Sequence, residues 1–418
     1  MDILRITTAG SVDDGKSTLI GRLLYDTRSI TNDKLEAIDT ASKKKGLGFT
    51  DLSLLTDGLI AEREQGITID VAHIYFSTPA RKYIIADSPG HVEYTRNMIT
   101  GASNASVFLI LIDARKGVIE QTKRHFYIAS LLRITKVVVC INKMDLVGFD
   151  EDVFKTIQKD FQSIVSMAGF KGQEIRFVPL AAKIGDNVVF PSVNMHWYKH
   201  STLLEFLENT SVALDNRKIP ARFPVQYVVR PLSEEFHDFR GYAGKVESGF
   251  FSRGEKIVVL PSLRSSRIKS LHRYTEEISE AAAKESVVIT LDDDIDISRG
   301  NMIAKCCDGF KQATELETTI CWMDESQSTT GKLYLLQHGT NRVKAKVTRI
   351  ANILDVQTMG TLPDKSSFAL NDIGDMTLKL AKPVFADRYE DNPSNGSFIL
   401  IDEYSNNTVA VGFIKEIR

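Results

Sequence analysis

The sequence GSVDDGKS, residues 10–17, decides the fold of this chain because it matches the phosphate-loop pattern G-x-x-x-x-G-K-[ST]. The apolar run 3–9 before it predicts a buried strand, and we expect a helix after it. Glycines at both ends let the backbone curl, so that its N–H groups converge on phosphate oxygens at a helix N-terminus. Lys16 then reaches the β and γ phosphates, and Ser17 ligates Mg²⁺. The residues predicted to bind phosphate are Gly10, Ser11, Val12, Asp13, Asp14, Gly15, Lys16, Ser17 and Thr18.

Around this loop, short apolar runs alternate with segments of helical periodicity up to about residue 210. Such alternation predicts an α/β domain with a doubly wound, mostly parallel sheet, the fold of a P-loop nucleotide-binding domain. The predicted strands cover residues 3–9, 83–86, 107–112, 137–141 and 177–180, and the predicted helices cover 121–132, 152–167 and 202–207.

The pattern changes after the breaker-rich stretch 214–224, where short β-branched segments are separated by turn signals. The remaining chain, about 200 residues, is long enough for two small barrels. We therefore predict a first domain over 1–215 followed by two all-β barrel domains over 216–312 and 313–418.

The segment Asn142-Lys143-Met144-Asp145 follows the strand 137–141 directly, at the edge where a doubly wound sheet presents its ligand-binding loops. The carboxylate of Asp145 can accept hydrogen bonds from N1–H and the exocyclic amino group of guanine. Adenine lacks this pair of donors and would leave the carboxylate unpaired. Asn142 is expected to tie the loops together, and Lys143 to lay its methylene stem on the ring. The sequence therefore predicts GTP as the nucleotide.

Two further segments are expected to sense the third phosphate. Asp87-Ser88-Pro89-Gly90 follows the strand 83–86 and supplies a carboxylate for the Mg²⁺ shell and a glycine N–H for the γ phosphate. Thr68, in Gly66-Ile67-Thr68-Ile69, can bond the ion through its hydroxyl when the γ phosphate is present. The predicted metal ligands are thus Ser17, Thr68 and Asp87.

These boxes, in this order, resemble the translation-factor class of GTPases, and DSPGHVEYTRNMITGA (87–102) is similar to the corresponding stretch of elongation factor Tu. The resemblance implies that His91 orients the attacking water, a task for which imidazole is suited. It also implies that the loop 180–183 recognises guanine O6 through a backbone N–H. This loop reads Leu-Ala-Ala-Lys where the class usually carries Ser-Ala-Lys, so Ala181 and Ala182 keep the backbone donor and lose a hydroxyl.

A narrower resemblance extends over essentially the whole chain, to the large, GTP-hydrolysing subunit of bacterial sulfate adenylyltransferase. The segments that carry it are GSVDDGKSTLIGRLLYD (10–26), PLAAKIGDNV (179–188), NMHWYKHSTLLEFLE (194–208), RFPVQYVVRP (222–231), FRGYAGKVESG (239–249) and NGSFILID (395–402). This family implies GTP hydrolysis coupled to the formation of adenylyl sulfate and pyrophosphate from ATP and sulfate on a small adenylyltransferase subunit. The alternative is an elongation factor Tu-like GTPase that delivers aminoacyl-tRNA.

The composition sets limits on partners and location. With 43% apolar and 25% charged residues, the chain has the make-up of an ordinary globular protein. No apolar run approaches the roughly 18 residues of a membrane span, and a net charge of −2 leaves no footprint for nucleic acid. The N-terminus leaves no room for a targeting peptide, which predicts a cytoplasmic protein. One phosphate loop in a chain ending at Arg418 predicts that a fused adenylyl-sulfate kinase is absent.

Overall fold

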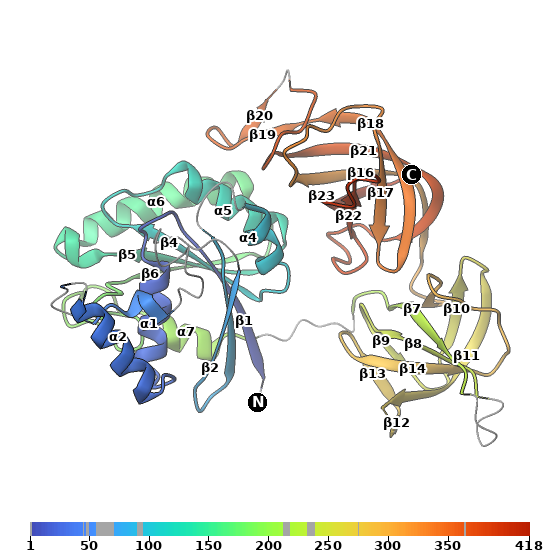
Figure 1. The fold of residues 1–418 in the computed structure, drawn as a ribbon, viewed down its shortest axis with the longest axis horizontal. Helices are drawn as coiled ribbons and strands as arrows, with labels where there is room; N and C mark the ends of the chain where they lie inside the picture. Colours follow the sequence, from blue (N-terminus) through green and yellow to red (C-terminus); the bar gives the residue numbers. More distant parts are fainter. Residues whose placement is uncertain are drawn as a thin grey trace. The chain divides into compact units, whose positions relative to one another are not determined.

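The computed structural model describes residues 2–418 except 45, 47–49, 56–70, 90–94, 212–217, 232–238, 275 and 363–364. The chain divides into two compact units (Figure 1). One contains residues 1–212 and 355–360, and the other contains 213–354 and 361–418.

A six-stranded sheet forms the centre of the first unit, with the order β2-β3-β1-β4-β5-β6. All neighbouring pairs are parallel except β2 and β3, which are antiparallel. The predicted doubly wound, mostly parallel sheet is therefore confirmed, with β2 as an additional edge strand. The strands are β1 (Ile3–Ala9), β2 (Ala72–Ser77), β3 (Lys82–Asp87), β4 (Val107–Asp113), β5 (Lys136–Asn142) and β6 (Glu174–Pro179).

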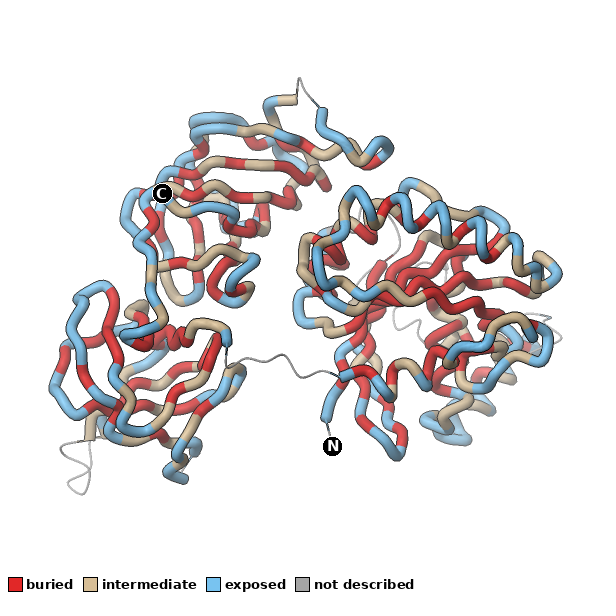
Figure 2. The backbone as a smooth tube through the Cα atoms, turned by 180° about the vertical axis from the view of Figure 1, so that it is seen from behind, coloured by how far each residue is buried: buried red, intermediate tan, exposed pale blue. Residues whose placement is uncertain are grey.

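Helices cover both faces of this sheet: α4, α5 and α6 lie on one side, and α1, α2 and α7 on the other (Figure 1). Because both faces are covered, the central strand β4 is buried along its whole length, as its continuous apolar sequence requires (Figure 2). The helical elements are α1 (Lys16–Asp26), α2 (Asn32–Lys44), η1 (Leu52–Leu55), α4 (Thr95–Ala102), α5 (Glu120–Leu131), η3 (Met144–Val147), α6 (Glu151–Ala168) and α7 (Leu203–Asn209).

Helix α6 shows how the sequence specifies one of these elements. Its buried residues, Phe154, Ile157, Phe161 and Ile164, recur at intervals of three or four and therefore share one face. The side chain of Asp150 caps the N-terminus by accepting the N–H of Asp152 at 2.7 Å. Acidic residues in the first turn also complement the helix dipole.

In the second unit, residues 222–305 form a sheet that closes on itself. The strand order is β10-β15-β7-β8-β14-β11-β12, and β11 pairs back with β10, so six of these strands form a ring. Strands β9 and β13 form a separate pair. The strands are β7 (Arg222–Val229), β8 (Gly241–Lys245), β9 (Phe250–Ser252), β10 (Lys256–Leu260), β11 (Arg264–Arg273), β12 (Glu276–Ile278), β13 (Glu280–Ala282), β14 (Ser286–Leu291) and β15 (Met302–Lys305).

A second closed barrel follows, with the order β16-β21-β18-β17-β22-β23. Trp322, the last residue of β16, is fully buried in its core and contacts the rings of Tyr334 and Phe368. Its indole N–H donates to the carbonyl oxygen of Ser326 at 2.8 Å, so burial leaves no polar atom of the ring unpaired. The strands are β16 (Lys311–Trp322), β17 (Leu333–His338), β18 (Asn341–Ala351), β19 (Ile353–Asp355), β20 (Gly360–Leu362), β21 (Ile373–Ala386), β22 (Ser397–Ile401) and β23 (Thr408–Ile417).

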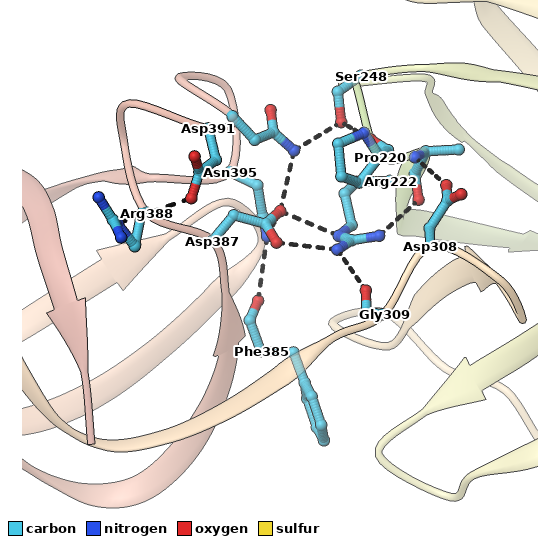
Figure 3. Close-up of polar contacts among 12 residues, drawn as sticks. Pro220, Arg222, Ser248, Asp308, Gly309, Phe385, Asp387, Arg388, Asp391 and Asn395 are labelled. Carbon is cyan, nitrogen blue, oxygen red and sulfur yellow. Dashed lines mark hydrogen bonds and ion pairs between the residues drawn. The ribbon is translucent and has the colours of Figure 1, made fainter. Parts of the chain in front are cut away.

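A buried ion pair joins the two barrels within this unit (Figure 3). Arg222, at the start of β7, is 2% exposed and makes two hydrogen bonds to Asp387, which follows β21. The Nε–Oδ2 distance is 3.0 Å and the Nη2–Oδ1 distance is 2.8 Å. Asp387 also accepts hydrogen bonds from the side chains of Asn392 and Asn395, at 2.9 and 2.8 Å. The buried carboxylate and guanidinium thus find hydrogen-bond partners in each other, and the carboxylate has two more in the asparagine side chains.

The predicted domain ranges are not tested by this division of the chain. The boundary at 215 lies among the residues outside the described part, and the boundary at 312 falls inside β16, after the first two residues of this strand. The three ranges therefore stay a prediction. Within the described ranges, no helix combines the length and the apolar character that crossing a bilayer demands.

Candidate nucleotide-binding site

The predicted phosphate loop connects β1 to α1, at the carboxyl edge of the parallel sheet. Gly15 is the N-cap of α1 and has a φ of 93°, a left-handed conformation that glycine adopts without strain. The loop is closed internally, because the carboxylate of Asp14 accepts the N–H of Ser11 at 2.7 Å. Among the described residues, no side chain caps this helix. The N–H groups of its first turn are therefore left for an anionic ligand.

Lys16 supplies the charge for such a ligand. Its side chain is largely buried, with 8% of the residue exposed, and no carboxylate in the described part of the chain pairs with it. Nearby His125 does not compete, because burial, Lys16 and Arg124 lower its pKa to about 3 and keep it neutral. A buried ammonium without a counter-ion is costly, and a phosphate at the loop would neutralise it. The loop thus fits a phosphate group.

Asn142, the last residue of β5, ties the phosphate loop to the loop after β6. Its Nδ2 donates to the carbonyl oxygen of Asp14 at 2.8 Å, and its Oδ1 accepts the N–H of Ala182 at 3.0 Å. A Cβ atom on Gly15 would lie only 2.5 Å from Nδ2 of Asn142. The tie therefore depends on glycine at position 15.

A Gly15→Ala variant should consequently lose nucleotide affinity. Alanine at positive φ costs about 1–2 kcal/mol, and here it also displaces Asn142. We expect GTP affinity to fall at least about 10-fold, measured by titration with a fluorescent GTP analogue. Gly172→Ala is the matched control, because Gly172 has a φ of 92° and nothing within 4 Å of an added Cβ. Equal GTP affinity of the two variants would contradict the role of Gly15.

Next to the phosphate loop lies a cavity of about 330 Å³. The half-buried carboxylate of Asp145, in η3, lines it and has no hydrogen-bond or ion-pair partner within the described residues. It is therefore available to a ligand with two donors. Of the predicted residues, the cavity brings together Gly15, Thr18, Asn142, Lys143, Asp145 and Ala182.

Lys143 is held rigidly beside this cavity. Its Nζ donates to the carbonyl oxygen of Asp13 and lies 3.0 Å from Oδ2 of Asp113, the last residue of β4. Burial alone would raise the pKa of Asp113, but hydrogen bonds from Arg115 and Lys143 outweigh it and hold the pKa well below its usual range. Asp113 thus stays charged and fixes the lysine.

In the loop after β6, the N–H groups of both alanines already have partners within the protein. Ala181 donates to the carbonyl oxygen of Asp186 at 3.2 Å, and Ala182 donates to Asn142 at 3.0 Å. A contact from the Ala182 N–H to guanine O6, as the sequence predicts, would be shared with Asn142. The loop is consequently fixed by contacts within the protein, without the hydroxyl that Ala181 lacks.

Asp87, at the end of β3, is the predicted metal ligand that the structure places most clearly. It is buried and accepts the hydroxyl of Thr8 at 2.8 Å, in a register that sets it beside the strand leading into the phosphate loop. A carboxylate there, with the hydroxyl of Ser17 at the start of α1, is the hard oxygen set that Mg²⁺ prefers. Thr68, Gly90 and His91 lie outside the described residues.

Comparisons with known proteins identify the family. Two family models match the sequence, the elongation factor Tu GTP binding domain over residues 1–213 and the GTP-eEF1A C-terminal domain-like family over residues 315–415. Sulfate adenylyltransferase subunit 1 of Shewanella oneidensis is 48% identical, over 98% of this chain and 84% of its own length. The protein of the same name from Cellvibrio japonicus is 46% identical, over 99% and 87%. The chain belongs to the sulfate adenylyltransferase subunit 1 family.

The membership confirms the resemblance predicted from the sequence, including the elongation factor Tu class of the first domain. Another relative, the bifunctional enzyme CysN/CysC of Mycobacterium tuberculosis, is 46% identical over 99% of this chain, which spans 67% of that enzyme. Among solved structures, that of sup35 complexed with GMPPNP aligns over 100% of this chain, with 23% identity and a TM-score of 0.45.

The sequence motifs predicted only half of the residues that line the cavity. Leu52 lines it because Gly21 allows η1 to approach α1; a Cβ on Gly21 would lie 2.2 Å from the carbonyl oxygen of Leu52. A glycine inside a helical pattern is the sequence signal for such an approach. The lining residues that the motifs did not predict are Arg22, Thr50, Asp51, Leu52, Leu146 and Lys183.

Proposed function

We propose that this chain is the GTP-hydrolysing subunit of a heteromeric sulfate adenylyltransferase and works in the cytoplasm with a small adenylyltransferase subunit. On that partner, ATP and sulfate would form adenylyl sulfate and pyrophosphate. The observation that carries the proposal is the cavity beside the phosphate loop in a chain of this family. Asp145 lines this cavity, and its carboxylate has no partner among the described residues.

The residues of the chain divide the work of holding GTP. The first-turn N–H groups of α1 and the ammonium of Lys16 bind the phosphates. The carboxylate of Asp145 selects guanine by accepting hydrogen bonds from two donors of the base. Ser17, Thr68 and Asp87 would hold Mg²⁺, which neutralises charge on the phosphates when it is bound. Gly90 would contact the γ phosphate, and His91 would orient the attacking water.

Hydrolysis must be coupled to the partner for a thermodynamic reason. Forming a sulfate–phosphate anhydride is strongly unfavourable, and a catalyst alone does not shift an equilibrium. A second, favourable reaction can do so only through states whose free energies depend on both sites. A GTPase domain whose loops respond to the γ phosphate supplies such states.

A His91→Ala variant tests the hydrolytic role. We expect GTP affinity to stay within about 2-fold of the unchanged chain, because the imidazole acts on water rather than on the nucleotide. Turnover should fall by roughly 10² or more, as for the loss of other positioned groups. Phosphate release in single-turnover experiments measures the step, and a normal rate would remove His91 from the mechanism.

Coupling is tested by combining the purified chain with its small subunit, ATP and sulfate. We expect adenylyl sulfate to accumulate beyond the uncoupled equilibrium only when GTP is present, with GDP formed at the same time. The Asp145→Asn variant in the same assay should abolish the GTP effect. Tight, GTP-dependent binding of aminoacyl-tRNA, with no effect on adenylyl sulfate, would instead favour an elongation-factor function.

A further inference from the structure

Arg22 joins helix α1 to the loop that follows β6. Its Nε donates to the carbonyl oxygen of Ala182 at 3.2 Å, and its Nη2 donates to the carbonyl oxygen of Lys183. Nη1 lies 3.6 Å from the carboxylate of Asp26, and the side chain is 17% exposed. The guanidinium also lies 5.5 Å from the centre of the Tyr25 ring. One side chain thus fixes two successive carbonyl groups of the loop.

The loop needs such support at this position. Ala181 provides no side-chain hydrogen bond, and the contacts to Asp186 and Asn142 engage only N–H groups. Arg22 instead holds the carbonyl groups of the next two peptide units, 182–183 and 183–184, and therefore sets the tilt of the planes that carry the N–H groups of Lys183 and Ile184. Because it also lines the cavity with Asp145, these planes lie where a base would bind.

We propose that Arg22 is a positioning residue for guanine recognition: by holding the carbonyl groups of Ala182 and Lys183, it fixes the peptide plane that carries the N–H of Lys183 and orients this N–H toward O6 of the base. The inference rests on the proposed function, since it applies only to a chain that binds guanine nucleotides. A lysine cannot replace the arginine fully, because one ammonium lacks the planar pair of donors that reaches both carbonyls.

The test compares GDP with 6-thio-GDP, which keeps both donors for Asp145 and replaces O6 by sulfur, a weak acceptor. In Arg22→Met we expect GDP affinity to fall about 10-fold and 6-thio-GDP affinity to change less than about 2-fold. Arg28→Met is the control, because Arg28 is exposed two residues beyond α1 and does not line the cavity. It should leave both affinities unchanged. Calorimetric titrations of the full chain measure all of these values.

Arg22→Lys keeps the charge and gives a second variant in case the methionine variant misfolds. Its loss of GDP affinity should be smaller than that of Arg22→Met, and its 6-thio-GDP affinity should likewise stay nearly unchanged. Equal loss of both nucleotides in a folded variant, or no loss of either, would overturn the role of Arg22. Failure of the unchanged chain to bind GDP would instead overturn the proposed function. The two failures are therefore distinguishable.

Discussion

An Asp145→Asn variant should bind GTP about 10²- to 10³-fold more weakly than the unchanged chain and should bind xanthosine triphosphate in its place. Each hydrogen bond to the carboxylate is worth about 1.5–3 kcal/mol. The asparagine amide offers one acceptor and one donor, so its NH₂ group meets the amino group of guanine without a partner. Xanthine carries a carbonyl oxygen at that position, which accepts from the same NH₂ group. Competition titrations with both nucleotides measure the switch.

Asp160→Asn provides a control of the same chemistry, because Asp160 lies on the exposed face of α6 and does not line the cavity. It should leave both affinities unchanged. Unchanged GTP affinity in Asp145→Asn would refute the contact to guanine. A folded variant that loses GTP without gaining xanthosine triphosphate would also contradict it, because a hydrogen-bond exchange predicts both changes.

The sheet and the central residues of the site could be predicted because their chemistry is local. The phosphate loop needs a glycine at a positive φ, and Gly15 has a φ of 93°. The whole motif lies within eight consecutive residues, so the local sequence is enough to predict it. The buried strands are continuous apolar runs, and four of the five predicted ones lie entirely within observed strands. The fifth, 177–180, extends one residue beyond β6, which ends at Pro179.

Other features depend on pairs of residues that are distant in the sequence. Arg22 looks like an ordinary polar position of an amphipathic helix, and its partners lie about 160 residues away. Strand β2 was missed because it is an antiparallel edge strand, where only Phe76 is buried and the apolar pattern is weak. Leu52 lines the cavity only because Gly21 admits it. A glycine inside a helical pattern signals a close approach, but the local sequence does not identify the segment that approaches.

A second large effect is expected at the joint between the barrels, where Arg222→Met should destabilise the unit formed by residues 213–354 and 361–418. Methionine leaves the carboxylate of Asp387 without its guanidinium, and breaking a buried pair from one side costs about 3–5 kcal/mol. Asp387→Leu should cost a similar amount, since Arg222 then stays buried without a counter-ion. Denaturant unfolding of the full chain measures both, followed through Trp322 in a Trp197→Phe background.

The combination of Arg222→Met with Asp387→Leu separates an ion pair from simple packing. If the charges act on one another, the double variant should lose less free energy of unfolding than the two single losses added, because no buried charge is stranded. Lys415→Met is the control. Lys415 pairs with Asp375 at 3.0 Å, but its side chain is 52% exposed. Such a surface pair should contribute less than about 1 kcal/mol to the free energy of unfolding. A cost for Arg222→Met no greater than that of Lys415→Met, or strictly additive losses, would show that the barrels do not depend on this pair.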